Sequence, residues 1–148
     1  MINFLQQYRF LVVPILVWIA IQSFKVMYDL AVTKKFNFKR IMGAGGMPSS
    51  HSAVVTSLAT MVGKNYGTDS AIDSIMFAMA TIFAMVVMYD AAGVRRAAGK
   101  QARLLNKIVE TPGLTGVQVT EKLVEVLGHT PTQVIVGATI GVIVGLLV

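Results

Sequence analysis

The sequence predicts an all-α integral membrane protein, with about four transmembrane helices and amphipathic surface helices in a single membrane-embedded domain over residues 1–148. Hydrophobic residues make up 55% of the chain and charged residues 14%, and the mean hydropathy is +0.68. A soluble domain of this length would struggle to bury so much apolar surface. The apolar residues gather in four segments, and no alternation of polar and apolar residues indicates a strand.

The first apolar segment covers residues 10–32, which is long enough to cross a bilayer at about 20 residues per span. No small-residue cleavage site follows its apolar core, so we expect a retained helix rather than a signal peptide. Lys25 and Asp29 interrupt its second half. Because a lysine inside a span is costly, Lys25 should pair with Asp29, extend toward the interface or contact a bound phosphate.

The next two apolar segments, residues 50–64 and 71–89, should form a helical hairpin through residues 65–70. The former is short and contains Ser and Thr, so we expect its neighbours to shield it. The last segment, residues 131–148, carries glycines at a spacing of four residues: Gly137, Gly141 and Gly145. This spacing places them on one helix face, where a second helix can approach closely, either within the monomer or in a homodimer.

A polar stretch, residues 90–128, separates the third and fourth apolar segments. Residues 94–109 are basic, with apolar residues near their end. Thr115 and Gln118 have the spacing of a capping box, and apolar residues then recur at helical spacing as far as Leu127. We therefore expect two amphipathic helices that lie on the membrane surface.

Counting the spans brings distant polar residues to one membrane face. If all four segments cross the membrane, the first loop, the start of the second segment and the whole polar stretch share that face. The residues that meet there are Lys34, Lys35, Arg40, His51, Asp90, Arg95, Arg96 and His129. The opposite face carries only Arg9 and Lys64 as basic residues, so the positive-inside rule places the polar face in the cytoplasm.

The two histidines of the chain occupy similar sequence contexts, since Pro48, Ser49 and Ser50 precede His51 and a Thr-Pro pair follows His129. Proline is favoured in the first helical turn, and Ser or Thr at the N-cap. Both histidines should therefore lie at helix N-termini, where the free amides and the helix dipole favour an anion. With basic residues on the same face, the two termini predict a phosphate site.

Two imidazoles beside one phosphate suggest that one attacks phosphorus while the other protonates the leaving oxygen. The chain has no cysteine, which excludes thiol nucleophiles and thiolate metal sites. No cluster of carboxylates is available for magnesium, so we expect neither a metal ion nor a cofactor. The simpler alternatives are that the histidines only cap helices and that Arg95 and Arg96 only follow the positive-inside rule.

Three motifs resemble the divergent branch of the type 2 phosphatidic acid phosphatase superfamily: GGMPSSHSA (45–53), YDAAGVRRAAGKQA (89–102) and LGHTPTQVIVG (127–137). They occur in the family's order, and the resemblance covers nearly the whole chain. It implies a membrane phosphatase that works through a phosphohistidine, with His129 as nucleophile and His51 as general acid. The phosphate-binding residues that it implies are Arg95, Arg96, Lys25 or Lys35, Ser49 and Ser50.

The chain departs from the family pattern at several positions. Gln133 replaces the usual aspartate, so either Gln133 or Asp90 should orient His129. More than 30 residues separate Arg96 from His129, where the standard pattern has five. The polar stretch must therefore loop out to bring the two motifs together.

The expected function is hydrolysis of a lipid phosphate of the phosphatidylglycerol phosphate or phosphatidic acid type. We expect a multi-pass protein of a bacterial-type plasma membrane, whose partners are the substrate, membrane lipids and a second copy of the chain, but no nucleic acid. The alternative is a degenerate site that binds anionic lipid or scaffolds other proteins.

Overall fold

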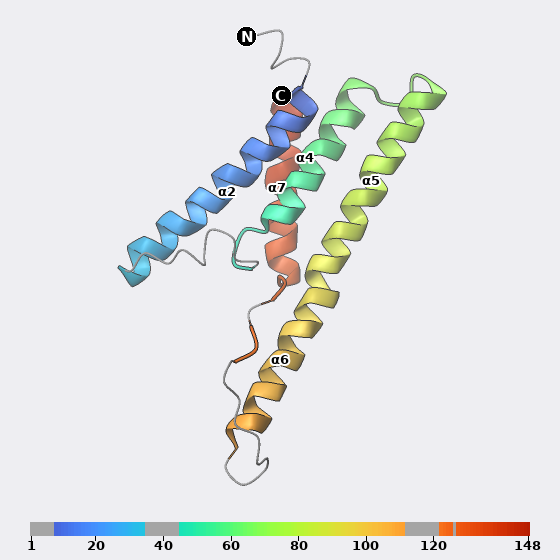
Figure 1. The fold of residues 1–148 in the computed structure, drawn as a ribbon. Helices are drawn as coiled ribbons and strands as arrows, with labels where there is room; N and C mark the ends of the chain where they lie inside the picture. The colour runs from blue at the N-terminus through green and yellow to red at the C-terminus, as the bar shows by residue number, and fades with distance from the viewer. Residues whose placement is uncertain (1–7, 35–44, 112–121, 126) are drawn as a thin grey trace.

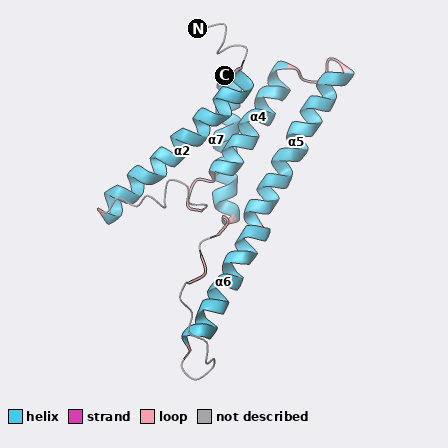
Figure 2. Ribbon diagram, in the orientation of Figure 1, coloured by secondary structure: helices cyan, strands magenta, loops and turns pink. Residues whose placement is uncertain are grey.

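The computed structural model describes residues 8–34, 45–111, 122–125 and 127–148. Within them the chain forms the five helices of Figure 1: α2 (Arg9–Thr33), α4 (Ser50–Asn65), α5 (Ala71–Ala92), α6 (Val94–Glu110) and α7 (Pro131–Leu147). Figure 2 shows helices and loops but no strand in this part of the chain, which confirms the predicted all-α class. Helix α2 and the continuous helical stretch Ala71–Glu110 are long and apolar enough to cross a membrane, and α7 is a shorter apolar helix.

The four apolar helices lie side by side and alternate in direction, and α6 continues from α5 (Figure 1). Helix α4 is central, because it contacts α2, α5 and α7. The N-terminal ends of α4 and α7 lie at the same end of the bundle as the junction between α5 and α6. This is the arrangement obtained by counting spans, and it brings the polar motifs together.

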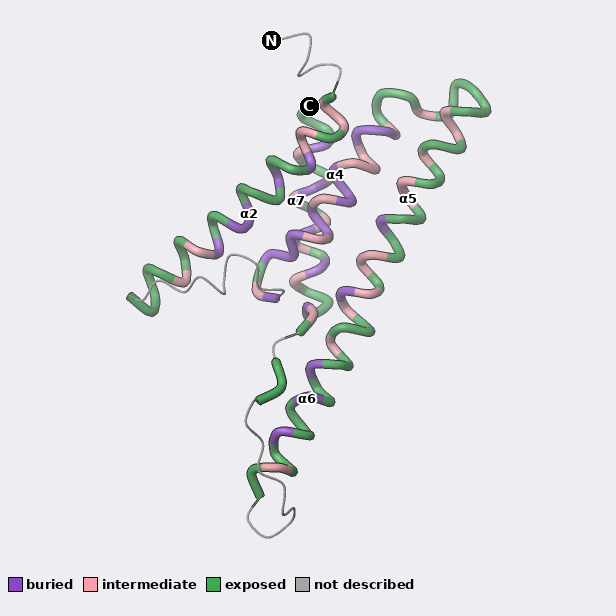
Figure 3. The backbone as a smooth tube through the Cα atoms, viewed as in Figure 1, coloured by how far each residue is buried: buried purple, intermediate pink, exposed green. Residues whose placement is uncertain are grey.

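Burial is concentrated on α4 and on the helix faces that contact it (Figure 3). Ala53 and Met61 are fully buried, and so are the hydroxyl residues Ser52 and Ser57. Large apolar side chains on α2, α5 and α7 instead face outward. This distribution is typical of helices that pack through small residues and present apolar side chains to lipid.

The glycine face of α7 packs directly against α4, within the monomer. A Cβ atom on Gly137 would lie 2.3 Å from the carbonyl oxygen of Ser49, and one on Gly141 would lie 2.1 Å from Oγ1 of Thr56. Gly145 would meet Thr60 in the same way, at 2.7 Å. The predicted close approach is confirmed, and α4 already occupies this face.

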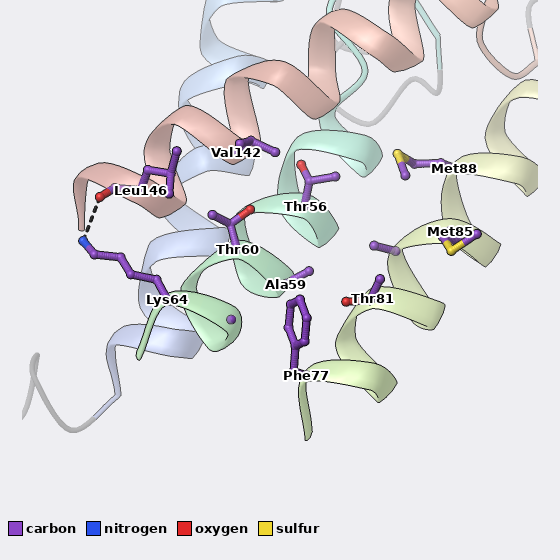
Figure 4. A pocket seen from close by; sticks show the side chains of 12 residues that line it. Thr56, Ala59, Thr60, Lys64, Phe77, Thr81, Met85, Met88, Val142 and Leu146 are labelled. Atoms are coloured by element: carbon purple, nitrogen blue, oxygen red, sulfur yellow. Dashed lines mark hydrogen bonds between the residues drawn. The ribbon is translucent and has the colours of Figure 1, made fainter. Parts of the chain in front are cut away.

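An apolar cavity of about 520 Å³ lies between α4, α5 and α7 (Figure 4). Phe77 and Thr81 of α5 line one side of it, and Thr60 of α4 lines another. At one end Lys64 donates a hydrogen bond to the carbonyl of Leu146 (2.7 Å). Neither histidine lines the cavity, so it is separate from the polar end of the bundle.

The polar stretch differs from the predicted pair of surface helices. Helix α6 continues in the direction of α5 rather than turning across the bundle. Residues 122–125 and 127 are not helical, and Thr115 and Gln118 lie outside the described residues. The side chain of Asn106 accounts for the non-helical backbone at Leu123, since its amide donates to the carbonyl of Leu123 (2.9 Å) and its side-chain oxygen accepts from the Leu123 amide (3.0 Å). These bonds replace those that a helix would supply.

We predict that Gly141→Ala destabilises the bundle by roughly 1–3 kcal/mol, because the new methyl group overlaps a backbone carbonyl and a hydroxyl of α4. The carbonyl oxygen of Ala53 would lie 2.3 Å from this Cβ atom. Thermal unfolding of the purified protein in detergent would measure the effect. Gly63→Ala is the matched control, because the three atoms nearest to its Cβ atom all belong to the side-chain ring of Phe77, which can rotate, and none to a backbone. Equal melting temperatures for the two variants would contradict the close packing of α7 against α4 at Gly141.

Candidate active site

Both histidines lie at helix N-termini, as the sequence predicted. Ser49 is the N-cap of α4, and its hydroxyl oxygen accepts hydrogen bonds from the amide (3.3 Å) and the hydroxyl (2.9 Å) of Ser52. Thr130 is the N-cap of α7 and forms a capping box with Gln133. Ser49, Ser50 and His129 are all buried. The two capped termini thus hold His51 and His129 at fixed positions.

The two imidazole rings lie next to each other, with centroids 5.9 Å apart and ring planes inclined by 58°. Nε2 of His129 and Nδ1 of His51 are buried, and neither makes a hydrogen bond in the described part of the chain. Buried ring nitrogens without a partner are uncommon in folded proteins. The pair can therefore accept a ligand that supplies the missing partners.

The inserted polar stretch returns to the start of α6 through Gly128. Its φ angle is +79°, and a Cβ atom there would lie 2.5 Å from the amide nitrogen of Arg96. The next residue, His129, donates its amide hydrogen to the carbonyl of Ala91 (2.9 Å), and the amide of Ser49 donates to the carbonyl of Gln133 (3.1 Å). These contacts join all three sequence motifs and confirm the predicted looping-out of the polar stretch.

Gln133 determines which nitrogen of His129 carries the proton. Its side-chain oxygen Oε1 accepts the amide hydrogen of Thr130 (3.0 Å), and Nδ1 of His129 lies 3.4 Å from the same oxygen. Because that oxygen can only accept, Nδ1 is the donor and Nε2 keeps its lone pair. This tautomer is assigned from the hydrogen-bond network. The nucleophilic nitrogen of His129 is therefore Nε2, which makes no hydrogen bond in the described part of the chain.

The pKa of His129 is lowered from its ordinary value of 6.5, chiefly by burial of the ring. The positive charge of Lys25 is the next cause, followed by that of His51. The Gln133 side chain and the Gly46 backbone act in the opposite direction. Since burial disfavours the charged form, His129 is neutral at pH 7 and retains its Nε2 lone pair.

Of Lys25 and Lys35, the two lysines that the resemblance suggests for phosphate binding, Lys25 lies next to the motif of His51. Lys25 is 4% exposed, and its ammonium donates to the carbonyl of Gly45 (3.2 Å), just before the motif of His51. Lys34 is the exposed C-cap residue of α2. Lys35 lies outside the described residues, as does Arg40. Lys25 is thus a buried cation whose charge acts on His129.

The two neighbouring arginines line different hollows on either side of the histidine pair. Arg95 and Asp90 form a salt bridge and line a hollow of about 300 Å³ beside His51. Arg96 is half-buried and lines a second hollow, of about 310 Å³, beside His129. Asp90, one of the two residues expected to orient His129, thus pairs with Arg95. The contact with Nδ1 of His129 comes from Gln133.

Sequence reasoning missed several residues that shape this site. Gly128 was not singled out, although a glycine directly before a candidate histidine is a signal for a sharp turn. Lys100 and Arg103, which the sequence distinguishes only as members of the basic stretch 94–109, both line the hollow beside His129. Among the described residues, no group of three His, Cys, Asp or Glu side chains is arranged to hold a metal ion.

Comparison with known proteins agrees with the motif resemblance. The sequence profile described as the Divergent PAP2 family matches residues 6–144. The uncharacterized membrane protein YuiD of Bacillus subtilis (strain 168) is 39% identical over 136 residues, an alignment that covers 84% of each chain. No solved structure matches the chain significantly. The chain belongs to the divergent PAP2 family.

Proposed function

We propose that the chain is a metal-independent phosphohydrolase that removes the phosphate monoester of a membrane lipid, of the phosphatidylglycerol phosphate or phosphatidic acid type. The observation that carries the proposal is the pair of imidazoles 5.9 Å apart, with Nε2 of His129 buried and lacking a hydrogen-bond partner in the described chain. An attack distance of about 3–3.5 Å to one ring and a hydrogen bond of about 2.6–3.2 Å to the other, joined by a P–O bond, exceed this separation in a straight line. One phosphate would therefore bind beside the pair and contact both rings from one side.

The proposed reaction has two steps. In the first, the Nε2 lone pair of His129 forms a bond to phosphorus while the bond from phosphorus to the ester oxygen breaks, and His51 gives a proton to the departing alcohol. In the second, water attacks the phosphohistidine, His51 takes a proton from the water, and the bond between nitrogen and phosphorus breaks. Inorganic phosphate leaves, and both histidines return to their starting protonation states.

The charges around the histidine pair suit a phosphate dianion. Lys25 and Arg96 supply positive charge on the side of His129, and Arg95 supplies it on the side of His51. The hydroxyl oxygen of Ser49 accepts two hydrogen bonds from Ser52, which leaves its own hydrogen as a donor to a phosphate oxygen. The amides of the first turn of α4, including that of Ser50, add further donors.

The location of the site supports a lipid substrate. The histidines lie at the ends of helices whose outward side chains are largely apolar, so a headgroup can reach them while its acyl chains stay in the membrane. The polar end of the bundle also carries most of the basic residues, which favours a cytoplasmic orientation. A lipid phosphate made on the inner leaflet would then be the substrate.

One observation favours a different role. Gln133 stands where the family pattern has an aspartate, and an amide cannot stabilise an imidazolium by charge. A chain that has lost turnover could still bind anionic lipid, or scaffold other proteins, at the same cationic site. The histidine variants described next separate these two possibilities.

We predict that His129→Ala and His51→Ala each lower phosphate release from lipid phosphates by at least about 10²-fold, the scale of general acid–base catalysis. Purified protein would be assayed on a panel that includes phosphatidylglycerol phosphate and phosphatidic acid. Thr139→Ala, an exposed position on α7, is the control for handling and folding. Turnover that survives both histidine changes would reject the mechanism, and lipid binding by a wild type without turnover would favour the non-catalytic role.

We predict that Gln133→Glu moves the acid limb of the kcat/KM profile to higher pH, by about one unit or more. In the wild type the lowered pKa of His129 means that the nucleophile becomes protonated only at a lower pH than an ordinary histidine. A carboxylate next to Nδ1 raises that pKa, so protonation removes the nucleophile at a higher pH. At pH 8 kcat should rise, because the carboxylate stabilises the phosphorylated imidazolium. Gln101→Glu adds the same charge at an exposed position of α6, and an equal shift in that variant would contradict this role of Gln133.

The cytoplasmic orientation predicts which single-cysteine variants an impermeant maleimide can label. The chain contains no cysteine, so a variant carries only the one introduced. Asp69→Cys, in the exposed loop between α4 and α5, should react in intact cells. Lys107→Cys, exposed on α6, should react only after the membrane is permeabilised. The reverse labelling pattern would place the site on the outer face.

A further inference from the structure

The hollow beside His129 has more room than a single phosphate needs. Its volume of about 310 Å³ lies at the lower end of the range for small-molecule sites, about 300–1,000 Å³. The hollow opens between α6 and the N-terminus of α7. His129, Thr130 and Gln133 form one wall, and Arg96, Lys100 and Arg103 line the side formed by α6.

The three basic residues lie on one face of α6, because their spacing of four and then three residues matches the helical repeat. Arg103 pairs with Glu125 (3.2 Å), which also accepts a hydrogen bond from Asn106 (2.9 Å). Arg96 and Lys100 form no salt bridge within the described part of the chain. Glu125 is the one carboxylate among the residues that line the hollow. Because it pairs with Arg103, Arg96 and Lys100 have no carboxylate partner in the described part of the chain.

Lys100 and Arg103 lie further along α6 than Arg96, and the rise of the helix gives their distances along its axis. The contact between Gly128 and the backbone of Arg96 places Arg96 level with His129. At about 1.5 Å per residue, Lys100 lies roughly 6 Å and Arg103 roughly 10 Å further along the helix axis. Lys100 and Arg103 thus extend the cationic lining of the hollow along α6, beyond the level of His129.

We propose that this hollow is a second anion subsite, which holds a further phosphate group of the same substrate. The proposal rests on the proposed function and deepens it: the substrate is a lipid with two phosphate groups joined by a short linker. The terminal monoester contacts both histidines, and the internal phosphodiester lies against Lys100 and Arg103. Phosphatidylglycerol phosphate has this arrangement, whereas phosphatidic acid carries a single phosphate.

The subsite can be tested by ligand binding, without relying on turnover. Full-length His129→Ala protein in detergent, at physiological ionic strength, would be titrated with glycerol 1-phosphate, glycerol 1,3-bisphosphate and pyrophosphate. The bisphosphate should bind at least about tenfold more tightly than glycerol 1-phosphate, consistent with added hydrogen bonds between charged groups. Pyrophosphate should show a smaller advantage, because its phosphates are joined directly.

Substitutions on α6 identify the residues responsible. Lys100→Gln combined with Arg103→Gln should remove the advantage of the bisphosphate, because it lowers the affinity for the bisphosphate much more than the affinity for glycerol 1-phosphate. Lys107→Gln is the matched control, because Lys107 is exposed on the same helix and does not line the hollow. Equal binding of the two glycerol phosphates, or an equal loss in the control, would overturn the subsite. If the bisphosphate advantage is present but the wild type releases no phosphate from any lipid, the subsite stands and only the proposed function fails.

Discussion

One backbone contact determines the geometry of the site: the loop before α7 lies directly on the first turn of α6. Gly128 has a positive φ angle and approaches Arg96 too closely for a Cβ atom, so glycine satisfies both requirements. Because His129 follows at once, its amide reaches the carbonyl of Ala91. The cap of α4 is joined to α7 by the bond between Ser49 and Gln133, and this places His51 opposite His129.

This geometry produces an electrostatic environment suited to an anion. Lys25 is almost fully buried, and burying an ammonium is costly unless hydrogen bonds or an opposite charge compensate. The carbonyl of Gly45 supplies one such bond. Burial also keeps the His129 ring neutral, which limits repulsion between the imidazole and the nearby cations. A phosphate in contact with both rings would provide partners for the buried Nδ1 of His51 and Nε2 of His129.

Local sequence signals predicted the helix starts, because Ser49 and Thr130 have strong N-cap preferences, and span counting predicted that the motifs would meet. The return along α6 was not predictable, since the apolar spacing near Leu123 indicates a helix, whereas Asn106 pairs with the Leu123 backbone. Nor could the sequence separate Arg95 from Arg96. Adjacent residues on an α-helix, with 3.6 residues per turn, point about 100° apart, and only the packed structure shows which hollow each one lines.

The most direct measurement asks whether both histidines contact the same anion. The chain has two histidines, so selective ¹⁵N labelling of their rings gives two sets of NMR signals, which His51→Ala assigns. Orthovanadate, a phosphate mimic, would be titrated into the labelled protein. If one oxyanion contacts both rings, the signals of both histidines shift with the same apparent Kd, and Nε2 of His129 shifts most. A shift of one ring alone, two unrelated binding curves, or no shift at saturating vanadate would contradict a shared site.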